Sequence, residues 1–150
     1  MKRMICFMLC LILPSAAYAL SDLDVMIEGH NLNCGICAAQ QLTGDPILDD
    51  GKAIFDLTPE LHDVFFTKGG EVTGFGCVCQ DPAQEVVFLA QCVTACLNFG
   101  GTADTVYDAV LSQFMFARAG NPLGGMVIPG MMIEITKESF GYVFAMSKVK

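Results

Sequence analysis

The chain has no tryptophan and few basic residues. Among its 150 residues there are eight lysines and arginines and two histidines, against 16 acidic residues. A chain with this charge balance repels phosphate backbones, which excludes nucleic-acid binding. It also has no apolar run of about 20 residues, the length that a membrane-spanning helix needs. Its composition is too apolar for a disordered chain and indicates a folded domain.

Several catalytic signatures are also missing. No serine lies in a G-x-S-x-G elbow, no glycine-rich phosphate loop occurs, and no paired-carboxylate motif is present. His30 and His62 stand alone in the sequence, and we expect His62 to be a surface residue. Asp45, Asp49 and Asp50 lack the alternating spacing of a calcium loop, so we predict a solvated turn there. The sequence therefore predicts no cofactor and no catalytic residue of these types.

The first nineteen residues have the three parts of a cleavable secretory signal. Lys2 and Arg3 give a positive start, residues 4–13 form a short apolar core, and an A-x-A sequence ends at Ala19. We expect cleavage after Ala19. The predicted location of the mature protein is the periplasm or the outside of the cell.

This cleavage divides the chain into a signal peptide, 1–19, and a single exported domain, 20–150. Cys6 and Cys10 leave with the signal, so six cysteines remain. Both basic residues of the signal are also lost, which leaves six basic against 16 acidic residues and a formal charge of −10. An even number of cysteines in an oxidising compartment predicts disulfide bonds. We therefore expect an acidic, cysteine-rich, disulfide-stapled domain.

The pattern of apolar residues and chain breakers predicts an α+β fold. Strands are expected at 23–28, 53–57, 71–79, 126–136 and 140–146, and helices at 34–42, 59–67, 81–98 and 102–119. Gly100 and Gly101 join the last two helices, a connection typical of an antiparallel helical hairpin. Gly74 and Gly76 indicate a bulge or a close backbone neighbour in their strand. The sequence thus predicts a small, mainly antiparallel sheet with a packed helical hairpin.

The six mature cysteines form three local pairs: Cys34 and Cys37, Cys77 and Cys79, Cys92 and Cys96. The first pair, at a predicted helix start, can close on itself. The second pair lies on one face of a strand and the third on one face of a helix, each about 6 Å apart. Neither of these two pairs suits an internal bridge, but their spacings match each other.

The connectivity follows from how far each cysteine lies from the turn between the strand and the helix. Cys79 and Cys77 lie about 10 and 16 Å before the turn, and Cys92 and Cys96 lie about 15 and 21 Å after it. A nested pattern keeps the same offset in both bonds, whereas a crossed pattern mismatches one bond by about 11 Å, too far for a disulfide. The predicted bonds are Cys34–Cys37, Cys77–Cys96 and Cys79–Cys92. Zinc is the competing use of these thiols, but export favours oxidation, so no metal site is predicted.

The Cys34-Gly35-Ile36-Cys37 motif resembles the active-site motif of thioredoxin-like thiol–disulfide exchange enzymes. Val127-Ile128-Pro129 and the hairpin after it resemble the cis-proline segment and the last two strands of that family. The resemblance implies a periplasmic oxidoreductase with Cys34 as the nucleophile, stabilised at a helix start, and Cys37 as the resolving thiol. The sequence lacks the final helix of that fold and has four further cysteines. We therefore predict a structural staple and keep the enzyme as an alternative.

The signal, the Cys34-x-x-Cys37 motif and the strand sequence Ile133-Glu134-Ile135-Thr136 resemble cysteine-rich periplasmic assembly proteins of conjugative transfer systems. The sequence favours a non-enzymatic, disulfide-stabilised interaction or assembly component of the cell envelope, with a protein partner. A membrane-associated subunit of a conjugation- or secretion-like envelope complex, in peripheral contact with the membrane, is the third function that we consider.

Overall fold

The structure is a computed structural model that describes residues 22–123, 126–128 and 130–149. The predicted signal peptide, its cleavage site after Ala19, and Cys6 and Cys10 lie outside the described residues. So does Pro129, on which the resemblance to a cis-proline segment depends.

Three α-helices, one short 3₁₀ helix and seven strands form the described part of the chain. Their order is α1 (Asp22–Cys37), β1 (Ile47–Asp49), β2 (Lys52–Thr58), β3 (Leu61–Lys68), β4 (Glu71–Cys79), η1 (Pro82–Gln84), α2 (Glu85–Asn98), α3 (Ala103–Arg118), β5 (Met126–Ile128), β6 (Met131–Glu138) and β7 (Gly141–Lys148).

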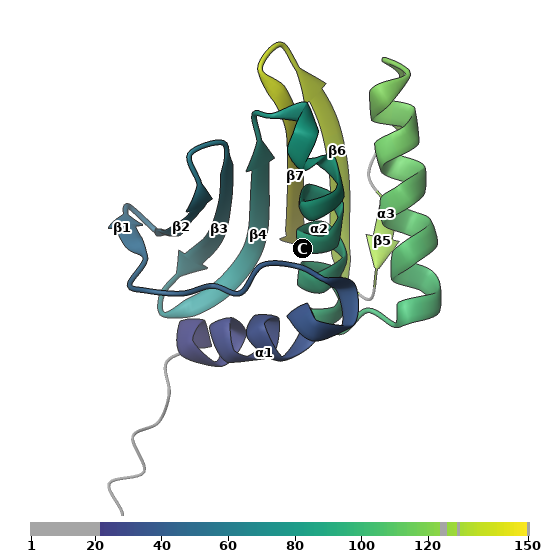
Figure 1. The fold of residues 1–150 in the computed structure, drawn as a ribbon. Helices are drawn as coiled ribbons and strands as arrows, with labels where there is room; N and C mark the ends of the chain where they lie inside the picture. Colours follow the sequence, from purple (N-terminus) through teal and green to yellow (C-terminus); the bar gives the residue numbers. More distant parts are fainter. Residues whose placement is uncertain (1–21, 124–125, 129, 150) are drawn as a thin grey trace, which may run out of the picture.

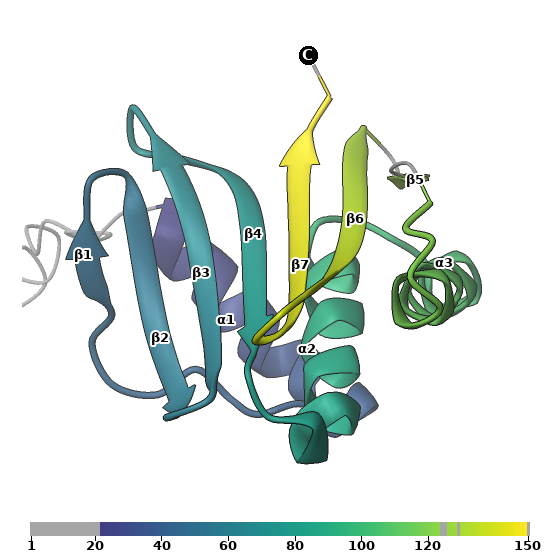
Figure 2. The same ribbon diagram turned by 90° about the horizontal axis from the view of Figure 1, so that it is seen from above.

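The strands form one antiparallel sheet in the order β1-β2-β3-β4-β7-β6-β5. All three helices lie on the same side of this sheet (Figures 1 and 2). α2 and α3 are neighbours with crossing axes, since Figure 2 shows α3 end-on and α2 from the side. The prediction of an α+β fold, with a mainly antiparallel sheet and a packed helical hairpin, is confirmed. The disulfide staples of that prediction are not seen, because all six described cysteines are free thiols.

The core lies between the sheet and the helices. Its centre is a row of fully buried phenylalanines on β3, β4 and β7, with ring centroids 5.1 Å apart for Phe65 and Phe75 and 6.2 Å apart for Phe75 and Phe144. Contacts of this kind stabilise the fold beyond the area that they bury. The β4–β7 pairing joins the strands before the helical hairpin to the strands after it. It is therefore the seam between the two halves of the sheet.

The predictions for the first part of the chain are wrong. Instead of a strand at 23–28 and a helix at 34–42, one helix, α1, runs from Asp22 to Cys37. The residues that it turns toward the core follow a helical spacing over about three turns: Leu23, Met26, Ile27, His30 and Cys34. The short alternation of apolar and acidic residues at the start of α1 is part of this longer helical pattern. A helix prevails over a strand here because it buries the apolar residues of the whole segment on one side.

The predicted helix at 59–67 is also wrong, because β3 occupies most of this segment. Pro59 and Glu60 form a turn, and Leu61, Asp63 and Phe65 then alternate toward the core. β3 has hydrogen-bonded neighbours on both sides, β2 and β4. The run of β-branched and aromatic residues favours a strand, and pairing on both edges overrides the helix-start signal of the proline.

The remaining elements follow the prediction closely. The strand at 71–79 and the helical hairpin are found, and the segment 126–136 is divided into β5 and β6 by a turn at Gly130, whose φ is +72°. None of the helices in the described ranges has the length and apolar character needed to cross a membrane.

Candidate functional site

The Cys34-x-x-Cys37 motif lies in the last turn of α1, not at a helix start as predicted. Cys34 is buried and its Sγ donates a hydrogen bond to the carbonyl oxygen of Gln40 at 3.2 Å, whereas Cys37 is partly exposed. A helix C-terminus carries partial negative charge and disfavours a thiolate. Burial, with the nearby Asp63 carboxyl, raises the pKa of Cys34 to about 11. The Cys34 thiol is therefore protonated at neutral pH, which removes the basis of the predicted nucleophile.

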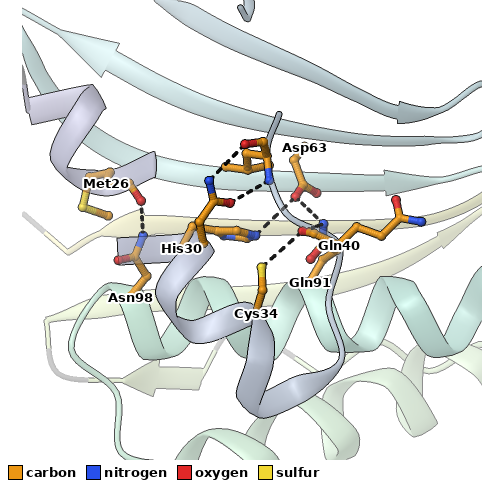
Figure 3. Close-up of polar contacts among 9 residues, drawn as sticks. Met26, His30, Cys34, Gln40, Asp63, Gln91 and Asn98 are labelled. Atoms are coloured by element: carbon orange, nitrogen blue, oxygen red, sulfur yellow. Dashed lines mark hydrogen bonds and ion pairs between the residues drawn. The ribbon is translucent and has the colours of Figure 1, made fainter. Parts of the chain in front are cut away.

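A closed polar cluster lies under α1 (Figure 3). It consists of His30 from α1, Asp63 from β3 and Gln91 from α2, each with no exposed surface. Gln91 Nε2 donates hydrogen bonds to Asp63 Oδ2 at 3.0 Å and to the carbonyl oxygen of Gln40 at 3.1 Å. His30 Nε2 lies 3.9 Å from Asp63 Oδ2, beyond hydrogen-bond distance. The fold thus brings together three polar side chains that are far apart in the sequence.

The chain segment after α1 closes this cluster. Asn31 accepts a hydrogen bond from the backbone nitrogen of Leu42 at 2.7 Å and donates one to its carbonyl oxygen at 3.0 Å. This pairing holds the segment against α1, so that the Gln40 carbonyl oxygen can accept from both Cys34 and Gln91. At the other side, Asn98 at the end of α2 donates to the carbonyl oxygen of Met26 at 2.7 Å (Figure 3). The position of α1 therefore depends on polar contacts as well as on packing.

Burial determines the charge of the cluster. It raises the pKa of Asp63 to about 7 and lowers the pKa of His30 to about 4. A low-dielectric interior favours the neutral form of both groups, and the 3.9 Å separation is too long to offset that cost. Both ring nitrogens of His30 and the Oδ1 atom of Asp63 have no hydrogen-bond partner in the described part of the chain. The cluster is costly to bury and closed to solvent, so it is not an open active site.

The remaining cysteines lie between β4 and α2, and all four are buried: Cys77, Cys79, Cys92 and Cys96. Burial raises the pKa of Cys77 well above its ordinary value, and the neighbouring Cys92 and Asp63 side chains raise it further. The predicted Cys34–Cys37, Cys77–Cys96 and Cys79–Cys92 bonds are not formed in the structure and stay predictions. Across the described residues, no group of three or more metal-ligating side chains has a geometry that could hold an ion.

An open apolar groove lies on the outer side of the helical hairpin. It has a volume of about 190 Å³, and we call it the hairpin groove. Its lining comes from the end of α1 and from both hairpin helices: Cys37, Val86, Leu89, Ala90, Val93, Tyr107, Val110 and Leu111. Val86, Tyr107 and Leu111 are 78%, 59% and 49% exposed. Such grouped exposure of large apolar side chains is typical of an interaction site.

The sequence indicated the wrong side of α2 as its buried side. Val86 belongs to a strong apolar stripe but faces solvent, whereas Gln91 and Thr94, expected opposite that stripe, are fully buried. The side that packs on the sheet contains Phe88 and Cys92, both with no exposed surface. The aromatic residue at 88 was the available signal, because a phenylalanine among small residues favours the core.

The other candidate residues lie apart from the cluster and the groove. His62 is on the uncovered side of β3, where its Nδ1 lies 2.7 Å from Asp56 Oδ1. Asp49 and Asp50 are exposed at the turn between β1 and β2, and Asp45 is exposed before it. Comparison of the chain with protein-family models, with curated proteins and with solved structures finds no match.

Proposed function

We propose that the protein is an exported, non-enzymatic interaction or assembly component of the cell envelope. In this proposal it binds a basic amphipathic segment of a protein partner in the hairpin groove. The observation that carries the proposal is the groove itself, an apolar surface between two helices, with Asp104 and Asp108 exposed on one of them. The predicted signal peptide supports export.

The groove continues as an apolar stripe along α3. Tyr107, Leu111 and Met115 are exposed and are spaced by four residues, so they follow one side of the helix. An amphipathic helix binds such a surface by placing its own apolar residues, at the same spacing, between the two helices. The helices are part of the core through their other sides, so the groove is already formed before a partner arrives.

Charge indicates the chemistry of the partner. Asp104 and Asp108 are exposed on α3, next to the stripe, and the mature domain is expected to carry a formal charge of −10. A segment with lysine or arginine beside its apolar residues is attracted to this surface, and an acidic one is repelled. Anionic lipid headgroups are repelled in the same way, which favours a protein partner over a peripheral membrane contact.

The binding prediction is that Leu111→Glu weakens the complex with a basic amphipathic peptide roughly tenfold or more. The substitution removes a large apolar contact from the centre of the groove. The probe is a synthetic helical peptide with a leucine face flanked by lysines, and affinity is measured by fluorescence anisotropy. Ser112→Glu is the matched control, because it adds the same charge at the next exposed position of α3.

Two outcomes contradict this proposal. One is equal affinity of the Leu111→Glu and Ser112→Glu variants for the lysine-flanked peptide, which would show that the groove is not the binding surface. The other is equal affinity of the wild-type protein for the same peptide with glutamates in place of the lysines. That result would show that Asp104, Asp108 and the negative charge of the domain do not select the partner.

A second prediction separates this proposal from the oxidoreductase alternative. In the reduced Cys37→Ser variant, alkylation of Cys34 by iodoacetamide should become about tenfold faster for each pH unit from 7 to 10, without a plateau. This follows from the pKa of about 11 that burial causes, because the thiolate is the reactive form. The denatured variant is the control and should level off near the ordinary thiol pKa. A plateau below about pH 8, with insulin-reducing activity in the wild-type protein, would favour the enzyme.

A further inference from the structure

The side of the sheet that faces away from the helices is an apolar surface. The helices lie on one side of the sheet (Figure 2), and no helix of the described ranges covers the other side. Apolar side chains on this second side alternate with the core residues along β2, β3, β4, β7 and β6, and they are half-buried or exposed: Ile54, Val64, Phe66, Val78, Met132, Val143 and Ala145. The solvated side of an antiparallel sheet ordinarily carries polar residues. We call this surface the open sheet face, and its apolar character is typical of an interaction site.

We infer that a second copy of this chain packs on the open sheet face. The two copies are related by a two-fold axis along the central strand, β4, so that the same surface of each copy contacts the other. The two sheets then lie face to face, about 10 Å apart, with their strands nearly aligned. Since the helices lie on the far sides, this dimer leaves the hairpin groove of each copy free and presents two grooves.

The shape of the open sheet face is complementary to itself. Phe66 on β3, Gly74 on β4 and Ser147 on β7 are neighbours in one row of the sheet. Phe66 is 37% exposed and forms a ridge. Beside it is a hollow of about 320 Å³, whose lining includes Gly74, Ala145 and Ser147. An axis along β4 places β3 of one copy over β7 of the other, so each Phe66 lies against the hollow of the second copy.

Charges at the two margins of the face are complementary in the same arrangement. Lys52 is exposed on β2 and Glu134 on β6, and the axis places β2 of one copy over β6 of the other. Lys52 lies in the same row as Met132, two residues from Glu134. The Cα atoms of Lys52 and of Glu134 in the second copy are therefore about 12 Å apart, within the combined reach of the two side chains. The symmetry forms this ion pair twice, and such pairs at the margin of an interface select the partner.

The other charges of the domain do not oppose this contact. On the open sheet face, Asp56 and His62 are paired within each copy, with Oδ1 and Nδ1 2.7 Å apart. Many acidic residues are on the helices, on the far side of the sheet, where the two copies do not meet: Asp22, Asp24, Glu28, Glu85, Asp104 and Asp108. The negative charge of the domain is therefore directed away from the interface.

The size of the open sheet face fits a second sheet better than a single segment. Five strands about 4.8 Å apart, with about six residues each, give a flat area of roughly 500 Å². A helix about 10 Å across would leave more than half of the width uncovered. Stable interfaces bury about 800 Å² of accessible surface per partner. Protruding side chains add to the flat area, so the dimer is near the lower end of that range and should depend on protein concentration.

The first test is the oligomeric state of the exported protein, measured by analytical ultracentrifugation over a concentration series with reductant present, which excludes intermolecular disulfides. We expect a dimer that Ala145→Glu weakens at least tenfold, because this substitution buries an unpaired charge at the centre of the interface. Ala103→Glu is the matched control, since it makes the same change at an exposed position of α3, and it should have no effect. A wild-type protein that stays monomeric at its highest soluble concentration would overturn the inference. So would a dimer that Leu111→Glu dissociates and Ala145→Glu does not, because its interface would be the hairpin groove.

Charge reversal tests the two-fold arrangement itself and does not depend on whether Ala145→Glu folds. Lys52→Glu and Glu134→Lys should each weaken the dimer about fivefold, because each replaces two attractive contacts by two repulsive ones. The variant with both substitutions exchanges the charges and should dimerise as the wild-type protein does. A double variant as weak as the single variants would refute the two-fold arrangement. Peptide binding in the hairpin groove enters none of these measurements, so the inference and the proposed function can fail separately.

Discussion

In the Asp63→Asn variant, the free energy of unfolding should increase with pH between about 4 and 6.5, relative to the wild-type protein, by on the order of 3 kcal/mol. The cause is His30. Burial lowers its pKa from 6.5 to about 4, so in this window the unfolded chain binds a proton that the folded protein does not. The resulting stability is present above pH 6.5 and is lost as the pH falls toward 4.

Asp63 has the opposite effect in the wild-type protein. Burial raises its pKa from 3.8 to about 7, so the folded protein retains a proton that the unfolded chain has released. The stability from this group is present below about pH 4 and is lost as the pH increases to 7. The two windows overlap, and the contributions of His30 and Asp63 largely cancel. In a variant that lacks one of these two residues, the pH dependence of the free energy of unfolding should therefore show the effect of the other residue.

The matched variant is His30→Gln, whose free energy of unfolding should decrease from pH 4 to 7 relative to the wild-type protein. Urea denaturation at several pH values measures all three curves, and only their differences are compared, because surface carboxyls are common to all. The nearby thiols of Cys34, Cys77 and Cys92 have raised pKa values and stay protonated over this range. A decrease in the Asp63→Asn variant would instead show that His30 and Asp63 form an ion pair in the folded protein.

The sequence was most informative where local signals and tertiary packing agree. The cap, proline and glycine signals around the helical hairpin are consistent with its amphipathic period, and α2 and α3 end within about two residues of the prediction. In the first part of the chain, the local signals and the tertiary packing conflict. The proline at position 59 indicates a helix start, but the segment after it becomes the strand β3 because it pairs on both sides.

The candidate sites were predicted less well, since they depend on contacts between distant segments. The polar cluster unites His30, Asp63 and Gln91 from three elements, and no local pattern predicts that polar side chains lie on the buried side of a helix. Periodicity gave the apolar stripe of α2 but not its direction, so the exposure of Val86 was missed. At Gly74 the sequence predicted a bulge or a close backbone neighbour, and the carbonyl oxygen of Met146 is such a neighbour.

Gly74→Ala should be strongly destabilising, with a loss of about 3 kcal/mol in the free energy of unfolding. A Cβ atom at this position would overlap the backbone carbonyl oxygen of Met146 in β7. Backbone cannot move aside as a flexible side chain can. Relief would require β4 and β7 to separate at the seam that joins the two halves of the sheet, where Gly74 pairs with Ser147.

Two further alanine substitutions, compared by urea denaturation, test whether the clash with the backbone of β7 causes the loss at Gly74. At Gly76, a Cβ atom would lie 3.3 Å from the ring of Phe66, a side chain that can shift, so the loss should be clearly smaller. At Gly35 in α1 nothing lies within 4 Å, and alanine should increase stability by up to about 1 kcal/mol because it favours the helix. Equal losses at Gly74 and Gly76 would mean that the β4–β7 approach is not what requires glycine. A graded series would show that the close approach of β4 and β7 is what requires glycine at position 74.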